Sequence, residues 1–241
     1  MDYDPLVLFI VGLGSIGLMA LASTLYVFVK LRILRSHAVN LLVAGGVGQL
    51  AALLLIVALS PILGIPLMDL FHIKLDAYFI LVTAASLGLA ILVLMASARI
   101  IGEEYLMKFP VETIRTLNPV VLALIVFVLA PVLEEMLFRG FFFYAFENLF
   151  NNGLIALALS SILFMFAHLR AVKLEGLTII LAIAFILGIP VLYLNTIIPS
   201  IIVHISINII GVLKSSELVR PSQVEETGNN ETFVEPRNIW I

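Results

Sequence analysis

Long apolar runs separated by short polar connections dominate the pattern of this chain. A run of about 20 apolar residues is long enough to cross the hydrocarbon core of a bilayer as a helix. The pattern predicts an all-α, polytopic transmembrane bundle with about seven spans, or eight if one of the last two is divided. The expected spans are approximately Pro5–Lys30, Val39–Leu63, Ala77–Ala98, Pro119–Asn148, Gly153–Leu169, Glu175–Leu194 and Pro199–Leu213.

The spacing of the polar connections divides the chain into three parts. Residues 1–118 hold three spans and a mixed polar segment from residue 99 to 118, which we expect to lie as an interfacial helix on the cytoplasmic side. Residues 119–214 hold the later spans, with a tight turn at Asn151-Asn152-Gly153 and kinks at Pro131 and Pro190. Residues 215–241 are polar and acidic, and we expect them to be disordered.

Lysine and arginine are distributed very unequally between the two sets of connections. Cytoplasmic loops carry an excess of these residues, which sets the orientation of a membrane protein. With the N-terminus outside, the outer connections hold only Lys74. The pattern therefore predicts an N-out, C-in protein of the cell membrane. The inner side then holds Lys30, Arg32, Arg35, Arg99, Lys108, Arg115, Arg170, Lys173, Lys214, Arg220 and Arg237.

Composition narrows the chemistry that such a bundle can perform. The chain is 62% apolar and 12% charged, about half the charged fraction of an ordinary soluble domain. It has no cysteine, which excludes disulfides, thiolate catalysis and Cys-ligated metal centres. No basic patch with interleaved aromatic residues occurs, so we expect no nucleic acid partner.

The segment Ala130–Gly140 (APVLEEMLFRG) places three ionisable side chains inside an apolar span. Charged groups at bilayer depth are costly unless they are paired or hydrated, so they indicate a functional site. On a helix Glu135 and Arg139 lie at i and i+4, in the favourable order for an ion pair. Glu134 points about 100° away from Glu135, so the same arginine cannot satisfy both equally well. We therefore expect Glu135 to be structural and Glu134 to be available for chemistry.

Three further polar side chains occur on the later spans. His168 lies near the end of the fifth expected span, four residues after Phe164, and His204 and Asn208 share one face of the last span. A carboxylate and an imidazole can together activate a water molecule. A second histidine and an asparagine can donate hydrogen bonds to a developing oxyanion.

Each of these residues also has a structural interpretation. His168 could be a packing histidine, and His204 with Asn208 could form hydrogen bonds between helices. The Phe141–Phe143 run could face lipid or pack in the core. Two histidines and a glutamate could instead hold a divalent metal ion, although they lack the His-Glu-x-x-His spacing of the common zinc proteases.

Taken together, the three motifs resemble the CPBP family, which includes the CAAX prenyl proteases of the Rce1 type and the bacteriocin-processing or immunity proteins called Abi. The motifs are Glu134-Glu135-x-x-x-Arg139, Phe164-x-x-x-His168 and His204-x-x-x-Asn208. The resemblance covers roughly residues 119–214. It extends to the Ala-Pro before the glutamate pair, the Phe-Arg-Gly after it and the Pro-Ser-x-x-x-His that leads into the third motif.

This resemblance implies an intramembrane glutamic endopeptidase with a site open to the cytosol. Glu134 and His168 would activate water, His204 and Asn208 would form the oxyanion hole, and Glu135, Arg139 and Phe164 would support them. The implied partners are membrane lipid and a peptide or lipidated protein, in the CAAX case a prenylated one, and no cofactor is expected. The alternatives are a metal-dependent protease that uses Glu134, His168 and His204, a non-catalytic binding protein of the bacteriocin-immunity type, and a small carrier.

One expectation conflicts with this scheme. At about 1.5 Å per residue, Glu134 lies roughly 22 Å from Pro119 at the cytoplasmic end of its span, whereas His168 is expected much nearer that end. A tilt, a kink at Pro131 or a deeper start of the span would have to bring the two side chains together.

Overall fold

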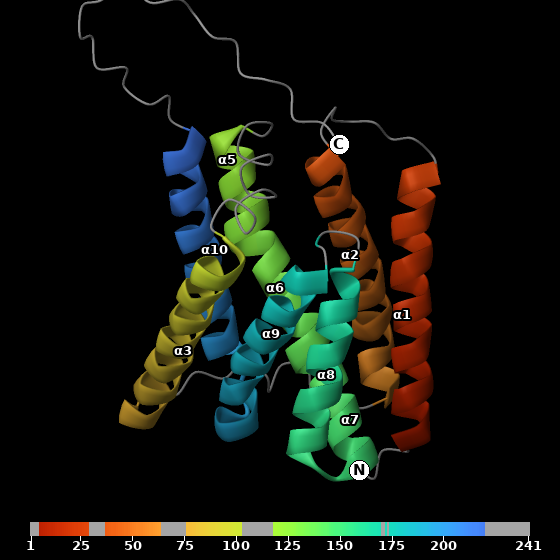
Figure 1. Ribbon diagram of the computed structural model, residues 1–241. Coiled ribbons are helices and arrows are strands. Elements are labelled where there is room, and N and C mark those ends of the chain that lie inside the picture. The colour runs from red at the N-terminus through yellow and green to blue at the C-terminus, as the bar shows by residue number, and fades with distance from the viewer. Residues whose placement is uncertain are drawn as a thin grey trace, which may run out of the picture.

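The computed structural model describes residues 5–28, 37–63, 76–102, 118–169, 172 and 174–219, and all regular structure within them is helical. Most helices run side by side along one direction, as expected of a membrane bundle (Figure 1). The separate helices are α1 (Pro5–Phe28), α2 (His37–Leu63), α3 (Ala77–Ile101), α8 (Gly153–Ala167), α9 (Leu174–Leu194) and α10 (Ile198–Val219).

One further helix is continuous from residue 119 to residue 150 and switches between α-helical and π-helical turns four times. It consists of α5 (Pro119–Leu122), a π-helical stretch (Ala123–Leu129), α6 (Ala130–Glu135), a second π-helical stretch (Met136–Phe142) and α7 (Phe143–Phe150). In π-helical turns each N–H bonds the carbonyl five residues earlier, and such turns are frequent at functional sites. The glutamate pair lies in α6, between the two π-helical stretches.

The predicted all-helical membrane fold is confirmed. Among the described residues, four helical segments are long and apolar enough to cross a bilayer: Leu6–Tyr26, Val43–Ile62, Ala77–Ile101 and Leu174–Leu194. Their length and composition fit a multi-pass integral membrane protein. α8 has only 15 residues and rises about 22 Å, which is less than the roughly 30 Å of the hydrocarbon core.

Several local predictions can be compared with the described residues. The turn before α8 is confirmed: Asn151 is left-handed with φ 49°, and the Asn152 side chain caps α8 by accepting from the N–H groups of Leu154 and Ile155. α9 remains one continuous helix through Pro190. The expected start of the tail at residue 215 is wrong, because α10 continues to Val219. The expected interfacial segment beyond residue 102 and the tail beyond residue 219 lie outside the described residues.

Aromatic residues of the long helix form the centre of the core. Phe138, Phe141 and Phe142 are buried against apolar side chains of α1, α2, α8 and α9. The Phe141–Phe143 run therefore packs inside the protein and does not face lipid. This packing fixes the long helix between the N-terminal pair of helices and α8, and so it holds the glutamate pair of α6 at the middle of the bundle (Figure 1).

Candidate active site

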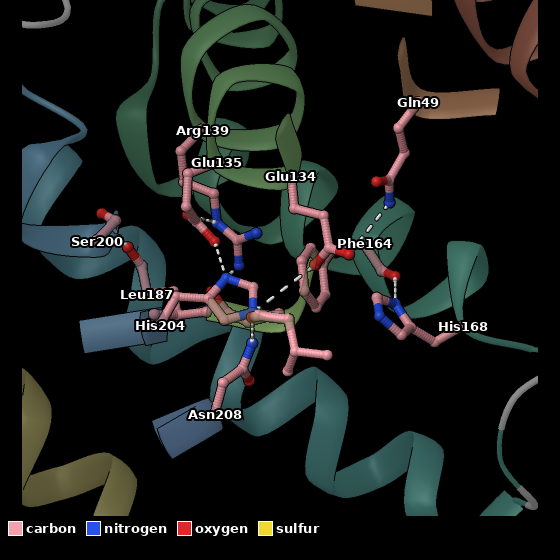
Figure 2. Close-up of polar contacts among 12 residues, drawn as sticks. Gln49, Glu134, Glu135, Arg139, Phe164, His168, Leu187, Ser200, His204 and Asn208 are labelled. Atoms are coloured by element: carbon pink, nitrogen blue, oxygen red, sulfur yellow. Dashed lines mark hydrogen bonds and ion pairs between the residues drawn. The ribbon is translucent and has the colours of Figure 1, made fainter. Parts of the chain in front are cut away.

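Side chains from several helical segments converge around Glu134 and Glu135 (Figure 2). Both glutamates lie in α6, Arg139 lies in the following π-helical stretch, and His204 and Asn208 lie on α10. Phe164 and His168 come from α8 and its C-terminal cap. All the residues singled out in the sequence therefore belong to one region of the fold, together with Gln49 of α2.

Glu135 and Arg139 form the predicted ion pair, with Arg139 Nε 3.3 Å from Glu135 Oε2 and both side chains fully buried. The nitrogen and oxygen are not aligned as a hydrogen bond, so the attraction is mainly between the two charges. The guanidinium is further held by a 2.8 Å hydrogen bond from Nη2 to the Ala184 carbonyl and by the Phe164 ring, whose centroid lies 4.3 Å from Cζ. A cation over an aromatic face gains electrostatic stabilisation. The Phe164 ring thus packs against the arginine.

His204 lies between the two glutamates. Its Nδ1 is 2.7 Å from Glu135 Oε1, and its Nε2 is 3.7 Å from Glu134 Oε2. Because Glu135 is held as a carboxylate by Arg139 and can only accept, the proton of this short hydrogen bond belongs to Nδ1 of His204. The contact fixes the ring orientation and directs Nε2 toward Glu134.

The two glutamates differ in their access to solvent. Glu135 and Arg139 are 0% exposed, whereas Glu134 is 9% and His204 is 7% exposed. A small accessible surface therefore remains on Glu134 and His204, and none remains on the ion pair behind them. That Glu135 is structural and that Glu134 is available for chemistry stays a prediction.

Gln49 is a residue of this region that the sequence motifs do not include. Its Nε2 donates a 3.2 Å hydrogen bond to Glu134 Oε1, so Glu134 is not as free of partners as the helix geometry alone suggests. Glutamine carries no charge, so it is absent from the set of ionisable groups that mark the site in the sequence. A signal is nevertheless present, since a buried amide in an otherwise apolar span requires a hydrogen-bonding partner.

His168 caps the end of α8. Its Nδ1 is 2.8 Å from the Phe164 carbonyl oxygen, which can only accept, so Nδ1 carries the proton and Nε2 has the free lone pair. The His168 and Phe164 rings lie 4.6 Å apart. No hydrogen bond or ion pair joins His168 to Glu134 in the described part of the chain, so the expected pair is neighbouring but not in direct contact (Figure 2).

Glu134 and His168 reach similar depths in the bundle because they lie on opposite arms of a helical hairpin. Glu134 precedes the turn residue Asn151 by 17 positions, and His168 follows Asn151 by 17 positions. Counted from this turn, the two side chains reach comparable levels, and Figure 1 shows α8 ending beside α6. Different depths were expected for Glu134 and His168 from the sequence because positions were counted from Pro119 and not from this turn.

Asn208 has a structural partner in the long helix. Its Nδ2 donates a 2.9 Å hydrogen bond to the Val126 carbonyl oxygen. In the π-helical register this carbonyl would accept from residue 131, which is a proline and has no N–H. The first π-helical stretch therefore ends before Pro131, and Asn208 supplies the missing donor. One N–H of the Asn208 amide remains for another acceptor.

Because the Asn208 amide replaces the N–H that Pro131 lacks, substitutions at these two positions should have coupled effects on stability. Asn208→Ala is expected to destabilise the protein by about 1 kcal/mol, because the Val126 carbonyl loses its donor. In a Pro131→Ala background the effect should be smaller, since an alanine at position 131 restores an N–H. Thermal unfolding of the four proteins in detergent measures the coupling, and strictly additive effects of the two substitutions would contradict this explanation.

The alternative metal set of Glu134, His168 and His204 is not assembled. Within the described ranges, no three or more histidine, aspartate or glutamate side chains converge with a geometry suited to a metal ion. Glu134 instead contacts Gln49 and His204, and Glu135 pairs with Arg139.

Comparison with known proteins finds a family model that matches the segment holding this arrangement. Residues 116–210 match the family model described as type II CAAX prenyl endopeptidase Rce1-like. This segment is similar to that family. The match contains all seven motif residues from Glu134 to Asn208 and confirms the resemblance over nearly the same range as the sequence predicts. No curated protein and no solved structure gives a significant match to the chain.

The Rce1-like match indicates a hydrolase of the CAAX-type intramembrane protease class. The matched segment begins in the connection before α5 and ends within α10, so it includes the whole long helix, α8 and α9. The N-terminal helices α1–α3 lie outside the match, although Gln49 of α2 contacts Glu134.

Proposed function

We propose that the Rce1-like core is a glutamate-dependent intramembrane endopeptidase in which Glu134 is the catalytic base. The observation that carries this proposal is the contrast between the two adjacent glutamates. Glu135 is fully buried in the ion pair with Arg139, whereas Glu134 keeps a small accessible surface, 9% of the residue, beside His204. The base needs access to water. The supporting ion pair needs protection from water, because hydration would weaken it.

In the proposed step Glu134 removes a proton from a water molecule as the water oxygen attacks the carbonyl carbon of the peptide bond. His168 assists on the other side of this water, using the Nε2 lone pair that its Nδ1 contact with Phe164 leaves available. The carbon–nitrogen bond then breaks. Glu134 returns the proton to the leaving amine, so the two products are a carboxylic acid and an amine, with no net change at the enzyme. The acid then gives its proton to the amine, which leaves a carboxylate and an ammonium group.

His204 and Asn208 are the proposed donors to the oxyanion of the tetrahedral intermediate. With Nδ1 of His204 committed to Glu135, Nε2 is the ring nitrogen that is left to face the substrate oxygen. The second N–H of Asn208 is the other donor, while the first remains on Val126. Oriented donors of this kind typically contribute about 10²–10³ in rate each.

The proposed substrate is a membrane-associated peptide, in the CAAX case one that carries a prenyl chain near its C-terminus. The Rce1-like match supports this class of substrate. The excess of lysine and arginine on one set of connections supports an N-out, C-in orientation in the cell membrane, with the site open to the cytosol.

Peptide cleavage by the purified full-length protein in liposomes tests this function. A prenylated C-terminal peptide and the same peptide without the prenyl chain are incubated with the protein, with and without a chelator, and the products are identified by mass spectrometry. We expect one internal cleavage of the prenylated peptide at a rate that the chelator does not change.

Other outcomes would select another function. Cleavage that stops with chelator and returns with added divalent metal would favour the metal-dependent alternative. The absence of cleavage of both peptides by correctly folded protein would contradict the proposed activity and favour a binding protein of the immunity type. Equal cleavage of both peptides would retain the peptidase and remove prenyl recognition.

A further inference from the structure

Gln49 belongs to a helix outside the Rce1-like segment, yet it contacts the proposed catalytic base. It is 6% exposed, and its Nε2 lies 3.2 Å from Glu134 Oε1 (Figure 2). A carboxylate can only accept a hydrogen bond, so the amide nitrogen must face Glu134. The contact therefore links α2 to the site through a defined donor and a defined acceptor.

The packing of α2 holds Gln49 in this position. Next to it, a Cβ at Gly48 would lie 2.6 Å from the Met19 carbonyl oxygen, so only glycine permits this close approach of α1 and α2. Ser23 Oγ of α1 also donates a 2.9 Å hydrogen bond to the Ala44 carbonyl of α2. These contacts leave α2 little freedom to move away from α6.

The face of α2 that carries Gln49 continues into the core. Ala52 and Ile56 follow Gln49 by three and seven residues, which places the three side chains on one side of the helix. Both apolar residues are buried in the cluster that contains Phe138 and Phe141. The core therefore fixes the rotation of α2 about its axis, and this rotation directs the amide at Glu134.

The effect on Glu134 follows from the geometry of a carboxylate. Rotation about the last side-chain bond of glutamate has a broad energy profile, so the group needs an external contact to fix its plane. Gln49 occupies Oε1, and Oε2 faces His204 Nε2. A neutral amide can fix the plane without neutralising the base, whereas a lysine at this position would form an ion pair with it.

We propose that Gln49 is a positioning residue for Glu134, so that the N-terminal helices complete the active site as well as anchoring it in the membrane. This inference rests on the proposed role of Glu134 as the base. Gln49 acts through Glu134 and does not touch the reacting atoms.

Kinetics of two variants test this role. Gln49→Leu keeps a side chain of similar size and removes the donor, and Gln49→Glu keeps the length but replaces the amide by a second carboxyl group. We expect kcat to fall about 10- to 100-fold in Gln49→Leu and further in Gln49→Glu, with KM within twofold of wild type. Ser60→Ala is the matched control on α2, because the Ser60 hydroxyl donates to the Val57 carbonyl of its own helix.

The outcomes separate this inference from the proposed function. Unchanged kcat in Gln49→Leu, alongside loss of cleavage in Glu134→Gln, would overturn the positioning role and leave the peptidase intact. Unchanged cleavage in both variants would contradict the peptidase mechanism itself. If Gln49→Leu does not fold, the isosteric Gln49→Glu decides, since a purely structural role predicts wild-type kcat in every molecule that folds. If Ser60→Ala lowered kcat and thermal stability as much as Gln49→Leu does, the inference would also be overturned.

Discussion

Glu134→Gln is expected to lower kcat for peptide cleavage by about 10²–10⁴, the range typical of a general base, without unfolding the protein. Glutamine matches glutamate in size, but its amide cannot take a proton from water. It also retains an oxygen that can accept the hydrogen bond from Gln49. Initial rates of purified wild type and variant in liposomes, with their unfolding temperatures, measure both parts of the prediction.

Glu147→Gln is the matched control for this substitution. It makes the same chemical change in the same long helix, 13 residues further along α7 and near the turn that begins α8. A Cβ added at Gly153 would lie 3.3 Å from Glu147 Oε1, which places this carboxylate at the end of the hairpin and away from His204. We expect the Glu147→Gln protein to cleave the peptide at the wild-type rate. Equal activity in the Glu134 and Glu147 variants would contradict the catalytic role of Glu134.

Glu135→Ala is expected to lower the unfolding temperature much more than Glu134→Ala. Removal of one partner from a buried ion pair typically costs about 3–5 kcal/mol, because the other charge is left uncompensated. Without Glu135, Arg139 keeps the Ala184 carbonyl, the Phe164 ring and the smaller attraction of Glu134, and His204 loses its 2.7 Å contact. Glu134→Ala removes the Gln49 hydrogen bond, the longer contact with His204 and that smaller attraction for Arg139. Thermal unfolding in detergent compares the two variants.

A double variant distinguishes a stranded charge from a simple loss of packing. Glu135→Leu combined with Arg139→Leu removes both charges, and we expect it to be more stable than Glu135→Ala, as is often found when apolar side chains replace a buried ion pair. Equal destabilisation by Glu134→Ala and Glu135→Ala, or a reversed order, would contradict the assignment of Glu135 to the supporting pair.

Much of the site could be predicted because its key relations are local in sequence. Glu135 and Arg139 are one helical turn apart, so their pairing follows from helix geometry alone. The shared depth of Glu134 and His168 also follows from the sequence once positions are counted from the turn at Asn151. The family motifs then identify the remaining helices that face these groups.

The contacts of Gln49 and Asn208 could not be predicted in the same way. Both reach the long helix from distant segments, Gln49 over 85 positions to Glu134 and Asn208 over 82 positions to Val126. Such contacts depend on how helices rotate and cross, which the sequence pattern does not specify. Local chemistry does leave one signal, because Pro131 removes a donor and some other group has to replace it.

The most direct test of the central claim is a single-turnover cleavage of the prenylated peptide in ¹⁸O-labelled water, with wild type and Glu134→Gln side by side. If Glu134 activates water, the new C-terminal carboxylate formed by wild type carries the label, the Glu134 side chain carries none, and Glu134→Gln forms almost no product. Label in the Glu134 side chain would instead indicate a covalent acyl intermediate. Labelled product formed at the same rate by Glu134→Gln would contradict the claim that this glutamate is the base.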